Sequence, residues 1–221
     1  MKVIAVMHSA FPEKFGIPRQ SGLVEDLHSV IVFEPEYRNP DALRGLEGFS
    51  HLWLLWMFSR AVRENWSPTV RPPRLGGNTR MGVFATRSPF RPNPIGLSSV
   101  KLEKIEQHGV LGPVLHVSGA DLMDGTPIFD IKPYLPYTDA HPEAQGGFAR
   151  EQPGGRLQVI LPPHLAEKVP PEQRKGLVGV LAQDPRPAYQ EKAERIYGMA
   201  FGGLEVKFTV SGDVLTVTDI L

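Results

Sequence analysis

The chain has 221 residues, of which 41% are hydrophobic and 22% are charged, so it is long and apolar enough to fold around a sizeable core, and a disordered protein is excluded. Its formal net charge of +0 provides no global attraction to nucleic acid, so such a partner would need a local basic surface. The absence of cysteine excludes disulfides, thiolate metal sites, iron–sulfur clusters and cysteine nucleophiles.

The first two thirds of the chain contain short apolar segments separated by Gly and Pro, a pattern typical of β-strands. The predicted strands are residues 3–7, 29–33, 49–58, 83–86, 97–102, 114–118 and 128–131. Short strands with frequent turn signals indicate a barrel or a sandwich, of which we expect a barrel. No long amphipathic pattern alternates with the strands, which argues against a Rossmann sheet. The segment 49–58 could be a buried helix by periodicity alone, but its aromatic residues and the preceding Gly48 favour a strand.

The sequence loosens between Asp139 and Pro163, where Gly and Pro are frequent and large apolar residues are rare. This composition is typical of a linker, and we expect a boundary near Ala144. Beyond it, the sequence predicts a strand at 157–161, a helix at 171–183 and a hairpin that pairs 204–210 with 214–220. The fold class is therefore expected to be mainly β, with a small β-barrel over residues 1–143 and a small α+β module over residues 144–221.

The most distinctive segment runs from residue 71 to 96 and combines arginines with frequent Pro and Gly but no Asp or Glu. Prolines hold the preceding residues extended, so the segment is expected to be a stiff cationic loop. Arg87 and Arg91 are four residues apart and could surround one carboxylate or phosphate, with Phe90 as a stacking surface. A solvated basic surface is the alternative. The remaining arginines could extend a track for a nucleic-acid backbone: Arg71, Arg74 and Arg80.

Two polar turns are candidates for ligand contacts. The segment PRQSG at 18–22 combines Gln, Ser and Gly, whose side-chain and backbone groups suit hydrogen bonds to a small ligand. In the segment 120–137, Asp121 and Asp124 flank a turn at Gly125, where carboxylates could bind ribose hydroxyls or act as a general base. Both segments could instead be plain surface turns. In the second segment, Asp-Gly is also a common hairpin signal.

Aromatic and histidine side chains near these turns add further candidates. Tyr134 and Tyr137 lie on a proline-stiffened segment and could stack on a base or simply pack. His51, in SHLW at 50–53, is a candidate for proton transfer, although a histidine on an apolar strand is often an ordinary core residue.

Several familiar motifs are absent from the sequence, namely a Walker loop, G-x-G-x-x-G, H-E-x-x-H and G-x-S-x-G, and the histidines are scattered. Common hydrolase and zinc-enzyme interpretations therefore lose support, and no metal is expected. The first residues lack the apolar core of a secretory signal, and the longest apolar run, 49–58, is too short to cross a bilayer. We therefore expect a cytoplasmic protein without a membrane partner.

Taken in order, the motifs resemble those of the TrmO family, also called YaeB-like or TsaA-like proteins, which are S-adenosylmethionine-dependent tRNA methyltransferases on a small β-barrel. The similar segments cover most of the chain: KFGIPRQSGL, GLEGFSHLWLL, VRPPRLGGNTRMGVFATRSPFRPNPIGLS, DLMDGTPIFDIKPYLPY, AQDPRPAY and YGM. One departure is Ala10, which stands where the family usually has proline.

The resemblance implies methylation of N6 in a threonylcarbamoyl-modified adenosine, next to the anticodon on its 3′ side, in threonine tRNA. It also implies a homodimer and an accessory C-terminal domain for tRNA contact or dimer packing. The residues that would hold S-adenosylmethionine are Gln20, Ser21, Gly22, Phe58, Ser59, Arg87, Leu97, Asp121, Leu122, Met123 and Asp124.

The acceptor nitrogen of such a nucleoside lies between a purine and a urea carbonyl, so its lone pair is delocalised and loss of its proton during attack is expected. We expect Asp124 to accept that proton, with His51 as second choice. Arg91 is expected to pair with the threonyl carboxylate or a phosphate. RNA contacts are expected from Arg71, Arg74, Arg80 and Tyr134.

Two other functional classes stay open at this point. A non-catalytic RNA-binding barrel would bind RNA with steep salt dependence and would not bind S-adenosylmethionine. A methyltransferase acting on a small molecule would fit the neutral net charge and would work without RNA.

Overall fold

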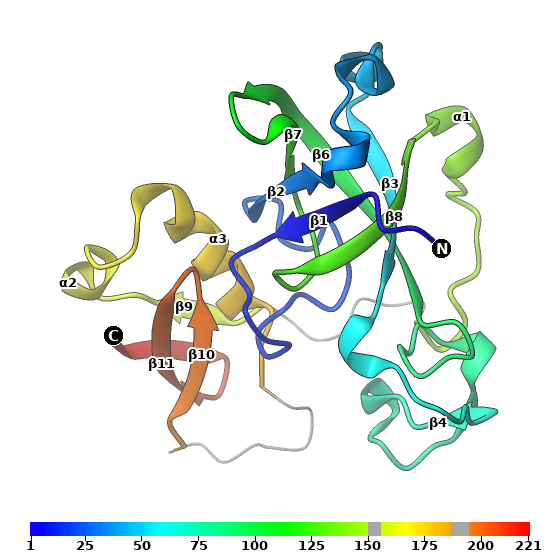
Figure 1. Cartoon of the computed structure of the whole chain (residues 1–221). Helices are drawn as coiled ribbons and strands as arrows, with labels where there is room; N and C mark the ends of the chain where they lie inside the picture. Colours follow the sequence, from blue (N-terminus) through cyan, green and yellow to red (C-terminus); the bar gives the residue numbers. More distant parts are fainter. Residues whose placement is uncertain (150–155, 187–194) are drawn as a thin grey trace.

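The structure, a computed structural model, describes residues 1–149, 156–186 and 195–221 of the chain. Figure 1 shows a β-barrel and, beside it, a smaller module that contains the C-terminus. The segment AQDPRPAY at 182–189 lies partly outside the described residues. In the described ranges, no helix combines the length and the apolar character that a membrane crossing requires.

Six antiparallel strands close the barrel in the order β1-β2-β7-β6-β3-β8. They are β1 (Ala5–His8), β2 (His28–Phe33), β3 (His51–Met57), β6 (Ile95–His108), β7 (Gly112–Ser118) and β8 (Thr126–Pro133). Because β1 pairs with both β2 and β8, closure leaves none of these strands with a free edge. The predicted barrel is confirmed.

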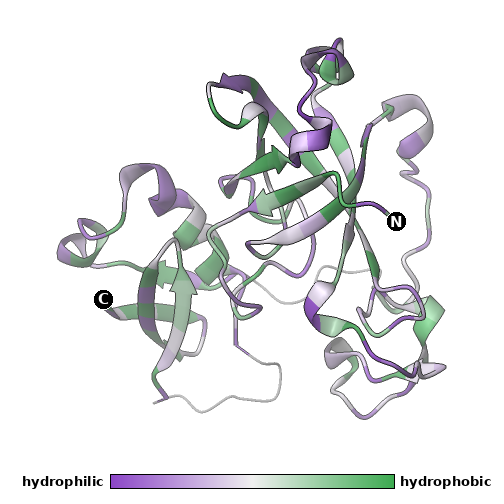
Figure 2. Cartoon of the chain, viewed as in Figure 1, coloured by the Kyte–Doolittle hydropathy of each residue, from purple (hydrophilic) through white to green (hydrophobic). Residues whose placement is uncertain are grey.

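Strand β3 shows how the sequence builds the barrel wall. Leu52, Leu54 and Trp56 alternate inward and are 0%, 0% and 6% exposed, so the segment is a strand and the alternative of a buried helix is wrong. Trp56 lies opposite Gly96 of β6, where an added Cβ would come within 2.2 Å of the indole ring. Glycine at this position therefore leaves space for the tryptophan. Figure 2 shows the hydrophobic residues running along the barrel strands.

The connection between β3 and β6, residues 58–94, is named here the arginine loop. It holds the two-stranded sheet β4 (Thr69–Val70) and β5 (Met81–Gly82), and three short 3-10 helices: η4 (Ser59–Ala61), η5 (Pro73–Leu75) and η6 (Val83–Ala85). The strand predicted at 83–86 is wrong, since η6 occupies it. The backbone N–H and the Oγ1 of Thr86 both donate to the Val83 carbonyl, at 3.2 and 2.9 Å, and this closes a turn in place of a ladder.

Further short helices, none of them expected from the sequence, occupy the other connections. They are η1 (Pro35–Tyr37), η2 (Pro40–Leu43), η3 (Leu46–Gly48), α1 (Pro136–Asp139) and η7 (Gly147–Ala149). Several begin with proline, whose fixed φ and missing N–H suit the first position of a helix.

The C-terminal module is a small α+β unit, as predicted. Its elements are β9 (Gln158–Ile160), α2 (Pro163–Ala166), α3 (Pro171–Ala182), β10 (Tyr197–Phe201), β11 (Leu204–Ser211) and β12 (Val214–Ile220), with the sheet order β10-β11-β12-β9. The predicted strand, helix and hairpin are confirmed, whereas α2 and β10 were not expected. The boundary predicted near Ala144 lies between α1 and β9 and stays a prediction.

The segment between β1 and β2, residues 9–27, is named here the β1–β2 loop, and it belongs to the core of the C-terminal module. Its residues Phe11, Val24 and Leu27 are at most 5% exposed and lie in one apolar cluster with residues of α3 and β10. The ring of Phe11 meets that of Phe201 edge to face, with centroids 5.6 Å apart. The barrel and the module therefore pack through this loop.

Backbone hydrogen bonds tie the same loop to both sides. Gly202 of the module donates to the Ala10 carbonyl at 2.7 Å. On the barrel side, Gly22 donates to the Gly119 carbonyl at 2.8 Å, and Asp124 donates to the Phe11 carbonyl at 2.8 Å. The loop is thus held at several points along its length.

The close approach of α3 to the β1–β2 loop depends on Gly176, because an added Cβ would lie 2.8 Å from the Asp26 carbonyl oxygen. We expect Gly176→Ala to destabilise the protein by about 1–3 kcal/mol through overpacking. The effect opposes the gain of about 1 kcal/mol that alanine normally brings inside a helix. Denaturant unfolding of Gly176→Ala measures it, with exposed Lys175→Ala as the control, for which a change within about 0.5 kcal/mol is expected. A more stable Gly176→Ala protein would contradict this packing.

Candidate functional site

Three segments that are far apart in the sequence meet beside the barrel. Arg87 of the arginine loop donates a hydrogen bond from Nη1 to Oε1 of Gln20 in the β1–β2 loop. Gln20 in turn donates from Nε2 to the Arg19 carbonyl. The charge of Arg87 and the backbone N–H of Ser21 both act on the carboxyl of Asp121, which follows β7. These four residues, Gln20, Ser21, Arg87 and Asp121, are named here the Gln20 cluster.

Asp121 is connected to the barrel interior by a chain of hydrogen bonds. Ser98 Oγ donates to Asp121 Oδ1 at 2.6 Å and accepts from Trp56 Nε1 at 3.0 Å. Burial raises the pKa of Asp121 above its ordinary value, although the Ser98 hydrogen bond, the Arg87 charge and the Ser21 N–H oppose that shift. The site therefore holds a carboxyl group that is partly shielded from water and is positioned by a hydrogen bond from Ser98.

Ser98 was not singled out from the sequence, although it is 1% exposed and bonds to the predicted residue Asp121. A signal was present, because serine occupies an inward position of β6 where an apolar residue is usual. Only the fold shows that this position lies beside Asp121.

Phe58, Ser59 and Leu97 lie near Trp56, at one end of the hydrogen-bond chain that links Trp56, Ser98 and Asp121. Phe58 packs its ring against Trp56 at a centroid distance of 4.2 Å, and its N–H donates to the Pro94 carbonyl at 2.8 Å. Ser59 begins η4, and Leu97, next to Ser98, is 56% exposed. An exposed leucine and a phenylalanine beside polar groups provide apolar surface for a ligand.

The two residues that follow Asp121 make different contacts. Leu122 is buried in the barrel core at 1% exposure, and its carbonyl accepts from Ser9 Oγ at 2.8 Å. The Met123 carbonyl accepts from Thr126 Oγ1 at 2.6 Å. Leu122 could therefore meet a ligand through its backbone but not through its side chain.

Asp124 is half exposed and faces β1. Its Oδ1 accepts from the Ser9 N–H at 3.2 Å and lies 3.3 Å from His8 Nδ1. Neither partner belongs to the Gln20 cluster, so the two aspartates of one turn serve different neighbours. Gly22 stays beside the cluster, since its N–H bonds to Gly119 at the end of β7.

His51 and Tyr134 lie at the other end of β3. Their rings are 6.2 Å apart, and Ser50 Oγ lies 2.9 Å from His51 Nδ1. Since β3 runs from His51 to Met57, about 20 Å of strand separates His51 from Phe58. The structure does not bring His51 or Tyr134 together with the Gln20 cluster.

Arg91 braces the arginine loop from within. Its Nη1 donates to the Thr86 carbonyl at 2.7 Å and also reaches the carbonyls of Val83 and Ser88, at 3.4 and 3.5 Å. All three bonds use Nη1, so Nε and Nη2 can still donate to a carboxylate or phosphate. Arg71 and Arg80 are exposed, whereas the side chain of Arg74, in η5, lies outside the described part of the structure.

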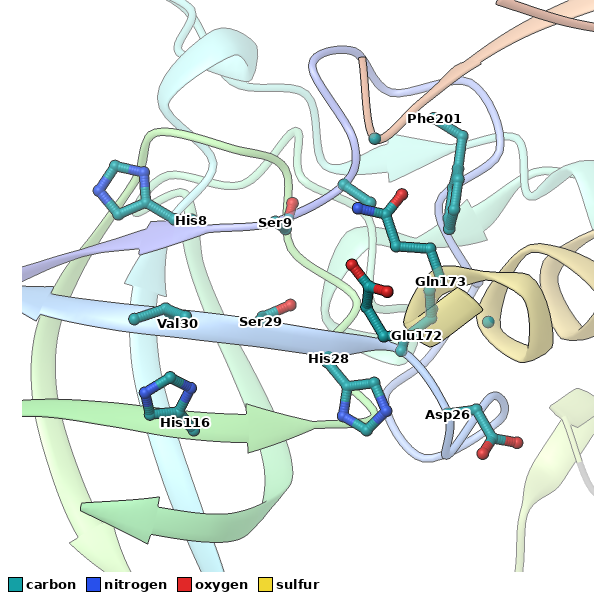
Figure 3. Close-up of a pocket in the computed structure, with 14 residues that line it drawn as sticks. His8, Ser9, Asp26, His28, Ser29, Val30, His116, Glu172, Gln173 and Phe201 are labelled. Carbon is teal, nitrogen blue, oxygen red and sulfur yellow. The ribbon is translucent and has the colours of Figure 1, made fainter. Parts of the chain in front are cut away.

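A separate pocket of about 320 Å³ lies where the barrel meets the C-terminal module. Figure 3 shows Glu172 and Gln173 projecting from α3 towards β1 and β2, with His8 and His28 on the barrel side. None of the predicted cofactor-binding residues lines it. The predicted site and this junction pocket are therefore different places.

Comparisons with known proteins agree with the motifs and the fold. The model of the tRNA-methyltransferase O N-terminal domain matches residues 6–140, and that of the TrmO C-terminal domain matches residues 155–221. A relative from Escherichia coli K12, named tRNA (adenine(37)-N6)-methyltransferase, is 44% identical over 94% of this chain and 92% of its own. A relative from Pseudomonas aeruginosa, named putative S-adenosylmethionine-dependent methyltransferase RcsF, is 41% identical over 98% of this chain and 95% of its own.

A solved structure supports the same assignment. The crystal structure of TrmO from Pseudomonas aeruginosa superposes with a TM-score of 0.80 at 35% identity, covering 100% of this chain and 98% of that one. The resemblance inferred from the sequence motifs is confirmed. The chain belongs to the tRNA-methyltransferase O family.

Proposed function

We propose that this protein transfers a methyl group from S-adenosylmethionine to N6 of adenine 37 in a tRNA. The names of the relatives support the reaction, the tRNA and the methyl donor. The observation that carries the proposal is the convergence of Gln20, Ser21, Arg87 and Asp121 beside the barrel of a chain that belongs to this family.

The donors and acceptors of the Gln20 cluster fit S-adenosylmethionine. The ligand carries an α-carboxylate that suits the Arg87 guanidinium, and an α-ammonium and ribose hydroxyls that suit the Asp121 carboxylate. Gln20 provides both a donor and an acceptor, and Phe58 and Leu97 provide apolar surface. When bound, the cofactor supplies an electrophilic methyl group, so the chain itself must mainly orient the nucleophile and exclude water.

We further propose that the substrate is the threonylcarbamoyl-modified adenosine of threonine tRNA. The proton on N6 then needs an acceptor, and we propose Asp124, whose carboxylate is half exposed and so reachable. Asp121 is a second carboxyl group in the same turn, and its raised pKa favours proton uptake. His51 stays the second choice of the sequence-based prediction, and it could act only on a nucleotide that reaches the far end of β3.

Further parts of the proposal rest on the family resemblance. Arg91 would use its remaining N–H groups for the threonyl carboxylate or a phosphate, and Arg71, Arg74, Arg80 and Tyr134 would contact RNA. The protein would act in the cytoplasm as a homodimer, with an N-terminal methyltransferase domain over residues 1–143 and an accessory module over residues 144–221.

We expect calorimetry to show saturable S-adenosylmethionine binding that Arg87→Ala weakens by about 10- to 100-fold, the range of a charge-assisted hydrogen bond. Arg44→Ala is the matched control, because Arg44 pairs with Asp41 on another exposed surface. Equal affinity in Arg87→Ala would remove Arg87 from the cofactor site. No binding by the unaltered protein would favour the RNA-binding barrel instead.

Single-turnover methylation separates the two aspartates. Because cofactor and tRNA are saturating, Asp124→Asn should slow methyl transfer by about 10²- to 10⁴-fold, the usual contribution of a general base, whether or not it also weakens cofactor binding. Asp121→Asn should chiefly weaken cofactor binding. Unchanged turnover in Asp124→Asn would show that the base assignment is wrong. Equal rates on tRNA with modified and with unmodified adenosine would contradict the threonylcarbamoyl-modified adenosine as the substrate.

Burial of the Asp121 carboxyl should make the ligand-free protein less stable at pH 7 than a variant with a neutral side chain at this position. A raised pKa means that the folded state binds the proton more tightly than the unfolded state, so this contribution to stability is full at low pH and is lost as pH rises through the folded-state pKa. Asp121→Asn should therefore raise the Tm at pH 7, and the gain should shrink as pH falls towards about 3.9, the ordinary pKa of aspartate.

Thermal unfolding at a series of pH values measures this difference. Glu143→Gln, which removes a carboxylate that is 80% exposed, controls for loss of charge alone and should leave the Tm nearly unchanged. A lower Tm for Asp121→Asn at pH 7 would contradict the argument.

A further inference from the structure

Two large aromatic side chains of the arginine loop face solvent together. Trp66 is 52% exposed and Phe84 is 72% exposed. Their rings are stacked, with centroids 6.1 Å apart and an interplanar angle of 28°. Exposed aromatic surface of this kind is costly in water, and a contiguous patch commonly marks a binding surface.

The sheet β4-β5 holds this pair in place. Thr69 of β4 pairs with Gly82 of β5, and the next backbone bond runs from the Val83 N–H to the Pro68 carbonyl at 2.9 Å. Trp66 and Phe84 therefore extend from the same end of a paired ladder. Val83, next to Phe84, is 1% exposed and anchors that side of the loop.

Guanidinium groups of the same loop lie over two of its phenylalanine rings, one of them Phe84. The Arg63 guanidinium carbon lies 3.7 Å from the centroid of the Phe90 ring, and that of Arg91 lies 5.9 Å from the centroid of the Phe84 ring. From residue 58 to residue 101, the only acidic residue is Glu64. The basic residues of the same segment are Arg60, Arg63, Arg71, Arg74, Arg80, Arg87, Arg91 and Lys101.

We propose that Trp66 and Phe84 form a stacking surface for an unpaired nucleotide of the RNA substrate, while arginines of the same loop bind the neighbouring phosphates. An aromatic face stacks on any base, and guanidinium groups pair with phosphates, so the two features together match single-stranded RNA. The inference rests on the proposed function, because it assumes that the substrate is RNA.

Charge argues for RNA over a second copy of the chain as the occupant. A two-fold interface centred on this surface would place the same arginines against each other, and juxtaposed like charges are unfavourable. A phosphodiester chain has the opposite charge. Figure 1 also shows β4 on the side of the barrel away from the C-terminal module, which leaves this loop uncovered by the module.

The stacking surface is linked to the candidate cofactor site. Arg87, which bonds to Gln20, follows Phe84 by three residues, so their Cα atoms are at most about 11 Å apart. A nucleotide stacked on Phe84 would thus be close in the RNA chain to one presented at the Gln20 cluster.

The test measures the affinity of Trp66→Ala and Phe84→Ala for unmodified and modified threonine tRNA across a salt series, together with S-adenosylmethionine affinity by calorimetry. Each variant should weaken tRNA binding by about 5- to 150-fold, the range of one lost base stack. Cofactor affinity and the slope of affinity against salt should stay unchanged, because the phosphate contacts remain. Trp66→Phe should restore most of the binding.

Two controls distinguish stacking from other effects. Val110→Ala removes an apolar side chain that is 81% exposed in the β6-β7 turn and should leave tRNA affinity unchanged. Arg71→Ala should instead reduce the salt slope by about one phosphate contact. Thermal unfolding checks that each variant is folded. If Phe84→Ala does not fold, the comparison relies on Trp66→Ala alone.

Unchanged tRNA affinity in the folded aromatic variants would overturn the stacking proposal but would not count against the proposed methyltransferase function. A loss of tRNA affinity that accompanies a change of oligomeric state in light scattering would also overturn it, and would assign the surface to an interface between copies. Failure of the unaltered protein to bind S-adenosylmethionine would count against the proposed function instead, so the two failures are distinguishable.

Discussion

The arrangement of the molecule depends on the packing of one loop, residues 9–27, between two hydrophobic cores. Phe11 is buried in the core of the C-terminal module, whereas Gly22 hydrogen-bonds to the end of β7 in the barrel. Gln20 and Ser21 lie within the same stretch. The module therefore supports the loop that carries part of the candidate cofactor site, and close packing transmits small displacements. This gives the module a structural role whether or not it also contacts tRNA.

The turn after β7 shows how two neighbouring carboxyl groups acquire different properties. Asp121 is drawn towards Ser98 in the barrel wall, where burial raises its pKa, while Asp124 stays half exposed beside His8 and Ser9. Under the proposed function, divergent environments of this kind would let one turn provide both a binding carboxylate and a proton acceptor. Burial of Asp121 is expected to lower the stability of the ligand-free state, a common cost of functional sites.

The arginine loop uses its cations in different ways. Arg91 spends three hydrogen bonds on backbone carbonyls and stiffens the loop, and Arg87 joins the loop to Gln20. Because these two arginines position the backbone, the exposed ones and the Trp66 and Phe84 rings are presented on a braced support. Such preorganisation would lower the entropic cost of the proposed RNA binding.

The barrel, the α+β module and the family could all be predicted from the sequence, because alternation in β3, the apolar spacing of α3 and long motifs are local signals. The sequence also pointed to Gln20, Ser21, Arg87 and Asp121 through the family resemblance. The folded structure was needed to show that Ser98 supports Asp121, that His51 lies at the far end of β3, and that residues 83–86 form a turn instead of a strand. The first two features depend on contacts between residues distant in the chain, which no local pattern encodes. The turn at 83–86 is instead closed by the local hydrogen bonds from Thr86 to Val83.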